Sequence, residues 1–162
     1  MPGISIAVSD TGLQKRIAAL QSGLSDLKPV LRVWGEIGVS SIARNFEEGG
    51  RPKRWKPLSP VTLALRRRRR KGTRSGRVAV STKVLFVTGT LSRVRYTVLA
   101  NSVQLGTAPA ARAYAAIHQY GGRAGRNRKV HIPARPYMLL QQEDIAEITR
   151  VGKAYFVNQG RP

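Results

Sequence analysis

The distribution of charge along the chain constrains what it can fold into more than any other feature. Between Glu48 and Glu143 there is no Asp or Glu, although that interval carries 21 Lys and Arg residues. All eight acids lie in the two outer segments, and the formal net charge is +21. A domain with this charge repels itself, so we expect an acidic protein surface or another polyanion beside the middle segment. The plainer alternative is that the basic residues only keep the subunit in solution.

Size and composition indicate one folded domain that spans residues 1–162. Hydrophobic residues make up 41% of the 162, which is ordinary for a chain long enough to bury a core. No apolar run reaches the ~20 residues of a membrane span, and the first residues lack the pattern of a secretory signal. There is no cysteine, and therefore no disulfide or thiolate site. These features favour a soluble protein that is made in a cytoplasm and has no membrane partner.

Hydrophobic periodicity predicts helices in both outer segments. After a short strand at 3–8 and a helix over 13–24, an apolar stripe at helical spacing runs over 27–46 and stops at Gly49–Gly50. A last helix is expected over about 142–156. Its apolar face is expected to consist of Ile145, Ile148 and Val151.

The middle of the chain shows the patterns of short strands and short helices. A serine and a proline begin a helix over 60–70, 94–100 and 103–107 form an antiparallel pair, and 109–120 is a helix ended by glycines. A basic loop at 123–129 then precedes a further short strand. The predicted fold class is therefore α+β: a small antiparallel sheet packed with a long N-terminal helical segment, a short central helix and a C-terminal helix.

Converging polar groups of the kind that an enzyme needs are missing from the sequence. The middle segment offers no carboxylate for acid–base catalysis, and Glu143, Asp144 and Glu147 lie at a helix start, where the helix dipole alone accounts for them. His118 and His131 have no third ligand at a metal-binding spacing, so hydrogen-bonding roles are expected for them. No nucleophile elbow or phosphate-binding glycine loop is present. We expect no catalytic residue, no metal site and no cofactor.

The most concentrated charge in the chain is a run of six cations: Arg66, Arg67, Arg68, Arg69, Arg70 and Lys71. In a helix these side chains point all around the axis, so they cannot form one packed face. Such a run suits contact with phosphates, whose affinity comes from counterion release and carries no base specificity. Together with the glycines and serines that follow, it predicts a basic flexible arm at about 66–82.

Five short motifs follow one another along the chain: WKPLSP at 55–60, VTGTL at 87–91, LGT at 105–107, YAAIHQYGG at 114–122 and IPARPYM at 132–138. In this order and spacing the chain resembles the virion morphogenesis family of Mu-like phages, which is similar to the tail-completion proteins of other tailed phages. The resemblance covers about Ile37 to Glu147. The arginine run and the loop after it depart from the family pattern, and the strand after the TGTL motif has less serine than expected.

This resemblance implies a structural, non-enzymatic component of a tailed-bacteriophage virion. It implies α+β subunits that close into a ring at the head–tail neck or the tail end, as a head–tail connector, tail terminator or tail completion protein. Six copies are expected, with twelve as the alternative; the partners are other neck and tail proteins and genomic DNA in the lumen. The extended ends at 1–9 and 157–162 would wrap onto adjacent subunits.

The motifs also supply candidate residues for a subunit or partner interface: Trp55, Pro57, Leu58, Tyr120, Pro133, Arg135 and Pro136. The prolines stiffen connections that must keep one shape against a neighbour. Trp55 and Tyr120 are interface anchors or, equally, core residues. Arg135, between two prolines, is expected to pair with a neighbour's carboxylate.

Charge alone leaves a second class open, a basic protein that binds or packages DNA without sequence specificity. This class predicts DNA binding by the free subunit that weakens steeply with salt and is lost when Arg66–Lys71 is replaced by serine. A third class, an enzyme such as a lysis factor or nuclease, would require a catalytic role for His118 or His131.

Overall fold

The computed structural model describes residues 12, 14, 15, 17–19, 21, 26–71 and 81–159. The seven described residues between 12 and 21 are helical, and the predicted strand at 3–8 lies outside the described residues. The further elements are α2 (Lys28–Glu48), α3 (Pro60–Lys71), β1 (Val94–Val98), β2 (Val103–Thr107), a 3-10 turn (Pro109–Ala111), α4 (Arg112–Tyr120), β3 (Gly122–Ala124), a second 3-10 turn (Arg126–Arg128), β4 (Val130–Ile132) and α5 (Gln142–Gln159). This mixture confirms the predicted α+β class.

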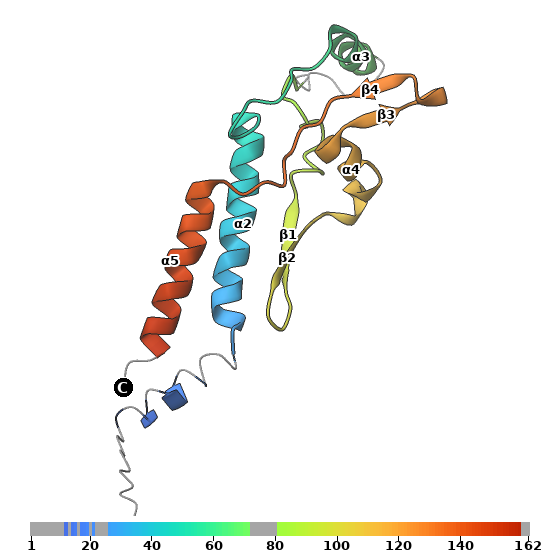
Figure 1. The fold of residues 1–162 in the computed structure, drawn as a ribbon. Coiled ribbons are helices and arrows are strands. Elements are labelled where there is room, and N and C mark those ends of the chain that lie inside the picture. The colour runs from blue at the N-terminus through green and yellow to red at the C-terminus, as the bar shows by residue number, and fades with distance from the viewer. Residues whose placement is uncertain are drawn as a thin grey trace, which may run out of the picture.

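The described chain has two parts, which we call the stem and the knob (Figure 1). The stem consists of α2, of α5 packed along one side of it, and of the β1–β2 hairpin packed along another side. The knob consists of α3, α4, β3 and β4, together with the loops between them, and lies at the C-terminal end of α2. Helix α2 is therefore the element around which the stem is built.

Local chemistry explains where α2 begins and ends. Pro29 lies in its first turn, where the missing N–H has no helical partner to lose, and Asp26 Oδ1 accepts a hydrogen bond of 3.1 Å from the Lys28 amide. The helix stops at Gly49, whose left-handed backbone (φ 74°) suits a residue without a side chain. The predicted end of this helix is confirmed.

Two glycines let the hairpin lie directly against α2. A Cβ atom added at Gly35 would come within 3 Å of the ring of Tyr96 on β1, and one added at Gly38 would lie 2.7 Å from Leu105 on β2. The side chains of the hairpin therefore occupy the space that larger helix residues would fill. Close packing of this kind replaces solvent with apolar contact along the stem.

The strands form two separate pairs rather than one sheet. β1 and β2 pair antiparallel with Val94 opposite Thr107, as predicted, and β3 and β4 pair antiparallel with Gly122 opposite Ile132. The first two residues of the predicted basic loop at 123–129 thus belong to a strand. Three residues are too few to show the alternation of apolar and polar side chains that is typical of a strand, so the hydrophobic pattern could not predict β3.

The hydrophobic core lies where the stem meets the knob. It consists of Ile42, Phe46, Trp55, Leu91, Val94, Ala111 and Tyr137. Three of its rings touch: Phe46 lies 5.5 Å from Trp55 and 5.4 Å from Tyr137 between ring centroids. Burial of such side chains contributes about 1.5–3 kcal/mol each, so the core holds segments from four parts of the chain together.

A buried polar cluster lies beside this core, around Asp144 near the start of α5. Asp144 is 0% exposed, and its carboxylate accepts hydrogen bonds from Ser41 Oγ, Arg44 Nη2 and the Gln141 amide. Arg51 Nη2 lies 3.5 Å from the same carboxylate and donates to the Ser41 backbone oxygen. The prediction that the helix dipole alone accounts for Asp144 is therefore wrong, because this residue joins α5 to α2.

Asn45 extends the cluster to the chain that connects the knob to α5. Its Nδ2 donates to the backbone oxygens of Tyr137 and Leu139, at 2.9 and 2.8 Å, and its Oδ1 accepts from Arg51 Nε. Each buried polar group of Asn45 is thus satisfied, which a buried network requires if it is to stabilise the fold. We refer to Ser41, Arg44, Asn45, Arg51 and Asp144 as the polar cluster.

The face of α5 that meets α2 agrees with the prediction in part: Ile148 and Val151 are half-buried, but Ile145 is not. Ile145 is 45% exposed, whereas Asp144 and Gly152 are buried, and Gly152 lies against Trp34 of α2. Asp144, near the start of α5, therefore takes the place on the packed face that was predicted for Ile145. None of the helices within the described ranges combines the length and the hydropathy that a membrane crossing needs.

Candidate functional site

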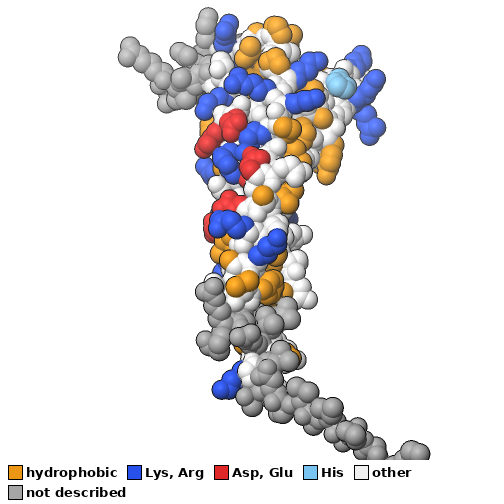
Figure 2. Space-filling view, turned by 60° about the vertical axis from the view of Figure 1, so that its left-hand side comes forward, with side chains coloured by type: hydrophobic (Ala, Val, Ile, Leu, Met, Phe, Trp, Pro, Cys, Tyr) orange, Lys and Arg blue, Asp and Glu red, His pale blue; other side chains and the backbone are white. Residues whose placement is uncertain are grey.

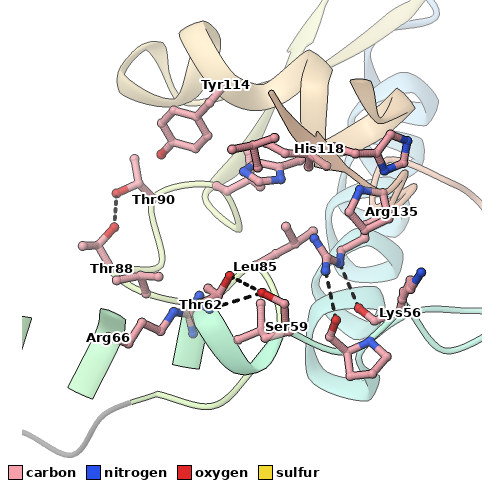
Figure 3. Close-up of a pocket in the computed structure, with 18 of the residues that line it drawn as sticks. Lys56, Ser59, Thr62, Arg66, Leu85, Thr88, Thr90, Tyr114, His118 and Arg135 are labelled. Atoms are coloured by element: carbon pink, nitrogen blue, oxygen red, sulfur yellow. Dashed lines mark hydrogen bonds between the residues drawn. The ribbon is translucent and has the colours of Figure 1, made fainter. Parts of the chain in front are cut away.

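The described residues form a groove in the knob with a volume of about 770 Å³. Its walls come from the loop before α3, from α3 itself, from the loop 85–91, from α4 and from β4. We call it the knob groove. Figure 3 shows Tyr114 and His118 of α4 on one side and Ser59, Thr62 and Arg66 on the opposite side, with Thr88 and Thr90 at one end.

The sequence motifs converge on this groove. Four motifs contribute to its lining: residues 56–60 of the first, 87–91 of the second, Tyr114 and His118 of the fourth, and Ile132, Pro133 and Arg135 of the last. Only the LGT motif at 105–107 lies elsewhere, on β2 in the stem. Four segments that are far apart in sequence therefore build one surface.

Hydrogen bonds to backbone atoms hold the two proline-rich walls together. Arg135 Nε donates to the Lys56 oxygen at 3.0 Å, and its Nη2 donates to the Pro57 oxygen at 3.3 Å. Trp55 Nε1 donates to the Pro136 oxygen at 3.0 Å. Arg135 bonds only carbonyl groups here and forms no ion pair with a described carboxylate. Its positive charge is therefore not neutralised within the described part of the chain.

Helix α4 positions the third wall. The Arg135 amide donates to the backbone oxygen of His118, and Gln119 Oε1 accepts hydrogen bonds from the amides of Tyr137 and Met138, at 3.0 and 3.1 Å. The last motif is thereby fixed along the helix. The wall is rigid because both of its segments are held by backbone contacts.

His118 is the polar group in this groove whose hydrogen bonds are incomplete. Its Nδ1 is buried and has no hydrogen-bond partner among the described residues, while its ring meets Tyr114 edge to face at 5.9 Å. Burial and the charge of Arg135 lower the pKa of His118 below its usual value. A neutral imidazole at this place offers one nitrogen to a ligand. The predicted hydrogen-bonding role thus lacks a partner within the described part of the chain.

The electrostatics of the groove are one-sided. Its lining includes Lys56, Arg66 and Arg135 and contains no acid. Arg66 is held in place by hydrogen bonds to the Ser81 and Lys83 backbone oxygens, at 2.6 and 3.2 Å. Figure 2 shows acidic side chains along the stem, whereas basic and hydrophobic side chains cover the top of the molecule in that view.

The basic run lies at the end of α3. Its first member, Arg66, lines the groove, and Arg67 is exposed. For residues 68–71 the structure describes only the helical backbone. Of the predicted arm at 66–82, the first six residues are therefore helical, and 72–80 lie outside the described residues.

The candidate interface residues divide into two groups. Trp55 and Arg135 are buried, at 7% and 6% exposure, and make the contacts within the chain described above. The others reach the surface to different degrees: Pro57, Pro136 and Tyr120 are exposed, with Tyr120 at 79%, and Leu58 and Pro133 are half-buried in the groove lining. A carboxylate of a neighbouring subunit, the partner predicted for Arg135, would have to compete with the two backbone oxygens that its guanidinium already binds.

Several residues of the groove were not singled out from the sequence. Leu85, Val87 and Val130 belong to its apolar lining, and Val87 and Val130 are exposed at 65% and 56%. They lie in short segments without periodicity, so only the fold shows that they share a surface. Among the described residues there is no group of His, Asp or Glu that could hold a metal ion.

The fold and the groove together define a small α+β protein whose most developed surface is an acid-free recess. Comparison with known proteins then identifies it further: the chain belongs to the phage virion morphogenesis family, whose model matches residues 8–156. It is similar to the Mu-like prophage FluMu G protein 2 of Haemophilus influenzae, with 38% identity over 128 residues, which cover 79% of this chain and 77% of that protein. No solved structure matches it. The resemblance carried by the motifs is confirmed, and the protein acts in phage virion morphogenesis.

Proposed function

We propose that the protein is a non-enzymatic structural subunit that forms a ring at the neck or at the tail end of a tailed-phage virion. The observation that carries this proposal is the convergence of the family motifs on one docking groove rather than on a set of catalytic groups. A groove stiffened by prolines and backbone hydrogen bonds suits binding to a neighbouring chain. Six copies are the expected number, with twelve as the alternative.

A closed ring is the assembly expected when identical subunits bind one another through two different surfaces. A groove on one side of a subunit and its occupant on another make a heterologous contact, and such contacts give a closed ring when the rotation between copies closes. Other neck and tail proteins are then the natural partners of the two faces of the ring.

Electron microscopy of negatively stained protein tests this proposal. The purified protein is imaged alone and together with its neck and tail partners, and the expected result is a ring of uniform diameter in at least one preparation. Its mass, measured by mass photometry, gives the copy number. Persistent monomers in both preparations would contradict the proposal.

A second function, non-specific DNA binding, is favoured by one observation. The exposed Arg67 and the four cations after it end a helix in a region without any acid. The test replaces 67–71 by serine and leaves Arg66, which holds the loop at 81–83, in place. A control variant loses an equal number of exposed cations from the stem: Lys28, Arg32, Arg95, Arg150 and Lys153.

The two variants separate a DNA contact from general charge. A DNA-binding function predicts a steep fall of affinity with salt for the wild type and a much larger loss in the variant of 67–71 than in the control. Equal losses in both variants would show that only the net charge matters, and would eliminate a DNA-binding arm.

A further inference from the structure

The knob groove is bordered by the edge of a strand. Val130, His131 and Ile132 all contribute to its lining, whereas successive side chains of a strand point to opposite faces. All three can line one groove only if the edge of β4 borders it. β4 pairs with β3 along its other edge and with no further strand in the described part of the chain. An exposed edge of this kind accepts an extended segment as an additional strand.

The lining of the groove selects the chemistry of such a segment. Leu58, Leu85 and Val87 supply an apolar surface, and the charged groups around it are cationic. An occupant therefore needs apolar side chains on one face, a carboxylate, and no basic residue that would face Lys56 or Arg135. The unpartnered Nδ1 of His118 offers it one more polar contact.

One segment of this chain has this combination, residues 3–10, GISIAVSD. Ile4, Ile6 and Val8 alternate with small residues, a period that favours a strand with one apolar face. Asp10 supplies the carboxylate, and the first basic residue of the chain is Lys15. The segment lies outside the described residues.

Its reach favours the groove of another copy over its own. Residue 26 lies at the end of α2 that is remote from the knob (Figure 1), and the 21 residues of α2 span roughly 30 Å. Between residues 10 and 28, the stretch 12–21, whose described residues are helical, covers about 14 Å, and the other nine steps cover at most about 30 Å. The segment reaches its own groove only if most of this connection folds back along the stem. A groove of an adjacent copy imposes no such path.

We propose that residues 3–10 of one copy add as a strand to the edge of β4 in a second copy, with the apolar side chains in the knob groove. Asp10 then lies among the cations of its rim. This inference rests on the proposed ring, and it names the contact that links each subunit to the next. Each copy gives one segment and receives one, which is the heterologous contact that a closed ring requires.

Disulfide trapping tests the contact, because the chain contains no cysteine of its own. A tagged subunit with Ile6→Cys is co-expressed with an untagged subunit that carries either Val130→Cys or Val157→Cys. The two acceptor positions are equally accessible in the single chain, at 56% and 58% exposure, and only Val130 lines the groove. A disulfide forms only where the Cα atoms approach within about 7 Å.

The expected result is a mixed covalent dimer with Val130→Cys, at least ten times more abundant than with Val157→Cys. Equal yields for both positions, or no dimer with either, would overturn the inference. So would a double variant, Ile6→Cys with Val130→Cys, that gives only internally cross-linked monomers, because the segment would then occupy its own groove. If the wild type forms rings and the cross-link fails, only the occupant is wrong; if no ring forms, the proposed function fails as well.

Discussion

Replacement of Asp144 by asparagine isolates the contribution of one charge to the contact between α5 and α2. Asn keeps the shape of the side chain and one oxygen acceptor, but it removes the negative charge that faces Arg44 and Arg51. The carboxylate is 0% exposed, and the side chain of Arg51 is 10% exposed, so solvent cannot replace the lost charge at Arg51. Removal of one partner from a buried pair costs about 3–5 kcal/mol.

Two features of the structure favour the lower end of this range of free-energy cost. The side chain of Arg44 is 41% exposed, so water takes over part of its interaction, and a partly exposed pair contributes little. Arg51 keeps a second carboxylate, Glu143, at 3.1 Å. We therefore expect Asp144→Asn to lower the free energy of unfolding by about 3 kcal/mol, which corresponds to roughly 6–12 °C in melting temperature for a chain of this length.

Guanidinium denaturation followed by circular dichroism measures this change. Protein concentration is held constant, because assembly would add its own stabilisation. The matched control is Glu147→Gln on the same helix, whose carboxylate pairs only with the exposed Arg150 at 3.8 Å and whose loss should cost less than about 0.5 kcal/mol. An Asp144→Asn protein within about 0.5 kcal/mol of the wild type would refute the assigned role of the buried charge.

Three further outcomes are expected. Gly35→Ala places a methyl group within 3 Å of the Tyr96 ring and should destabilise the stem by about 1–3 kcal/mol, whereas Gly106→Ala, with nothing within 4 Å of its Cβ, should change unfolding little. Because the pKa of His118 is lowered from 6.5 in the folded state, the unfolded chain takes up this proton first, and stability falls as pH drops below 6.5. In the His118→Asn variant, the urea midpoint of unfolding should depend less on pH between pH 6.5 and about 5 than it does in the wild type. An unchanged dependence on pH would contradict this. Tyr120→Ser should leave the melting temperature of the dilute subunit unchanged, since Tyr120 is 79% exposed, and a weaker oligomer in sedimentation would show that this side chain lies in an interface.

The elements of this fold that were predictable are those set by local chemistry. The end of α2 at Gly49 and the β1–β2 pair depend on residues adjacent in sequence, and both follow the prediction. Strand β3 was missed because three residues carry no period. Ile145 was placed on the buried face because a helical pattern counts apolar residues, and the residue that the fold buries there is Asp144.

The candidate site was predictable only in its parts. The motifs marked most of the segments that line the groove, but their convergence depends on contacts such as those between Arg135 and the Lys56 and Pro57 backbone, 79 and 78 residues away. The role of Asp144 depends on Ser41 and Arg44 in the same way, at separations of 103 and 100 residues. No local pattern encodes pairs so far apart in sequence. The residues of the site could therefore be identified from the sequence, but their partners could not.

The separation of acids on the stem from cations in the knob has a consequence for the timing of assembly. In the proposed ring, copies that bring their knobs to one rim would concentrate like charge there, and each added copy would raise the electrostatic energy of the rim wherever charges lie within the screening length, about 8 Å at physiological salt. A counter-charged body within that rim lowers this energy for every copy at once. In the proposed ring, closure of the rim would then be coupled to the arrival of its occupant, and subunits without that occupant would join more slowly.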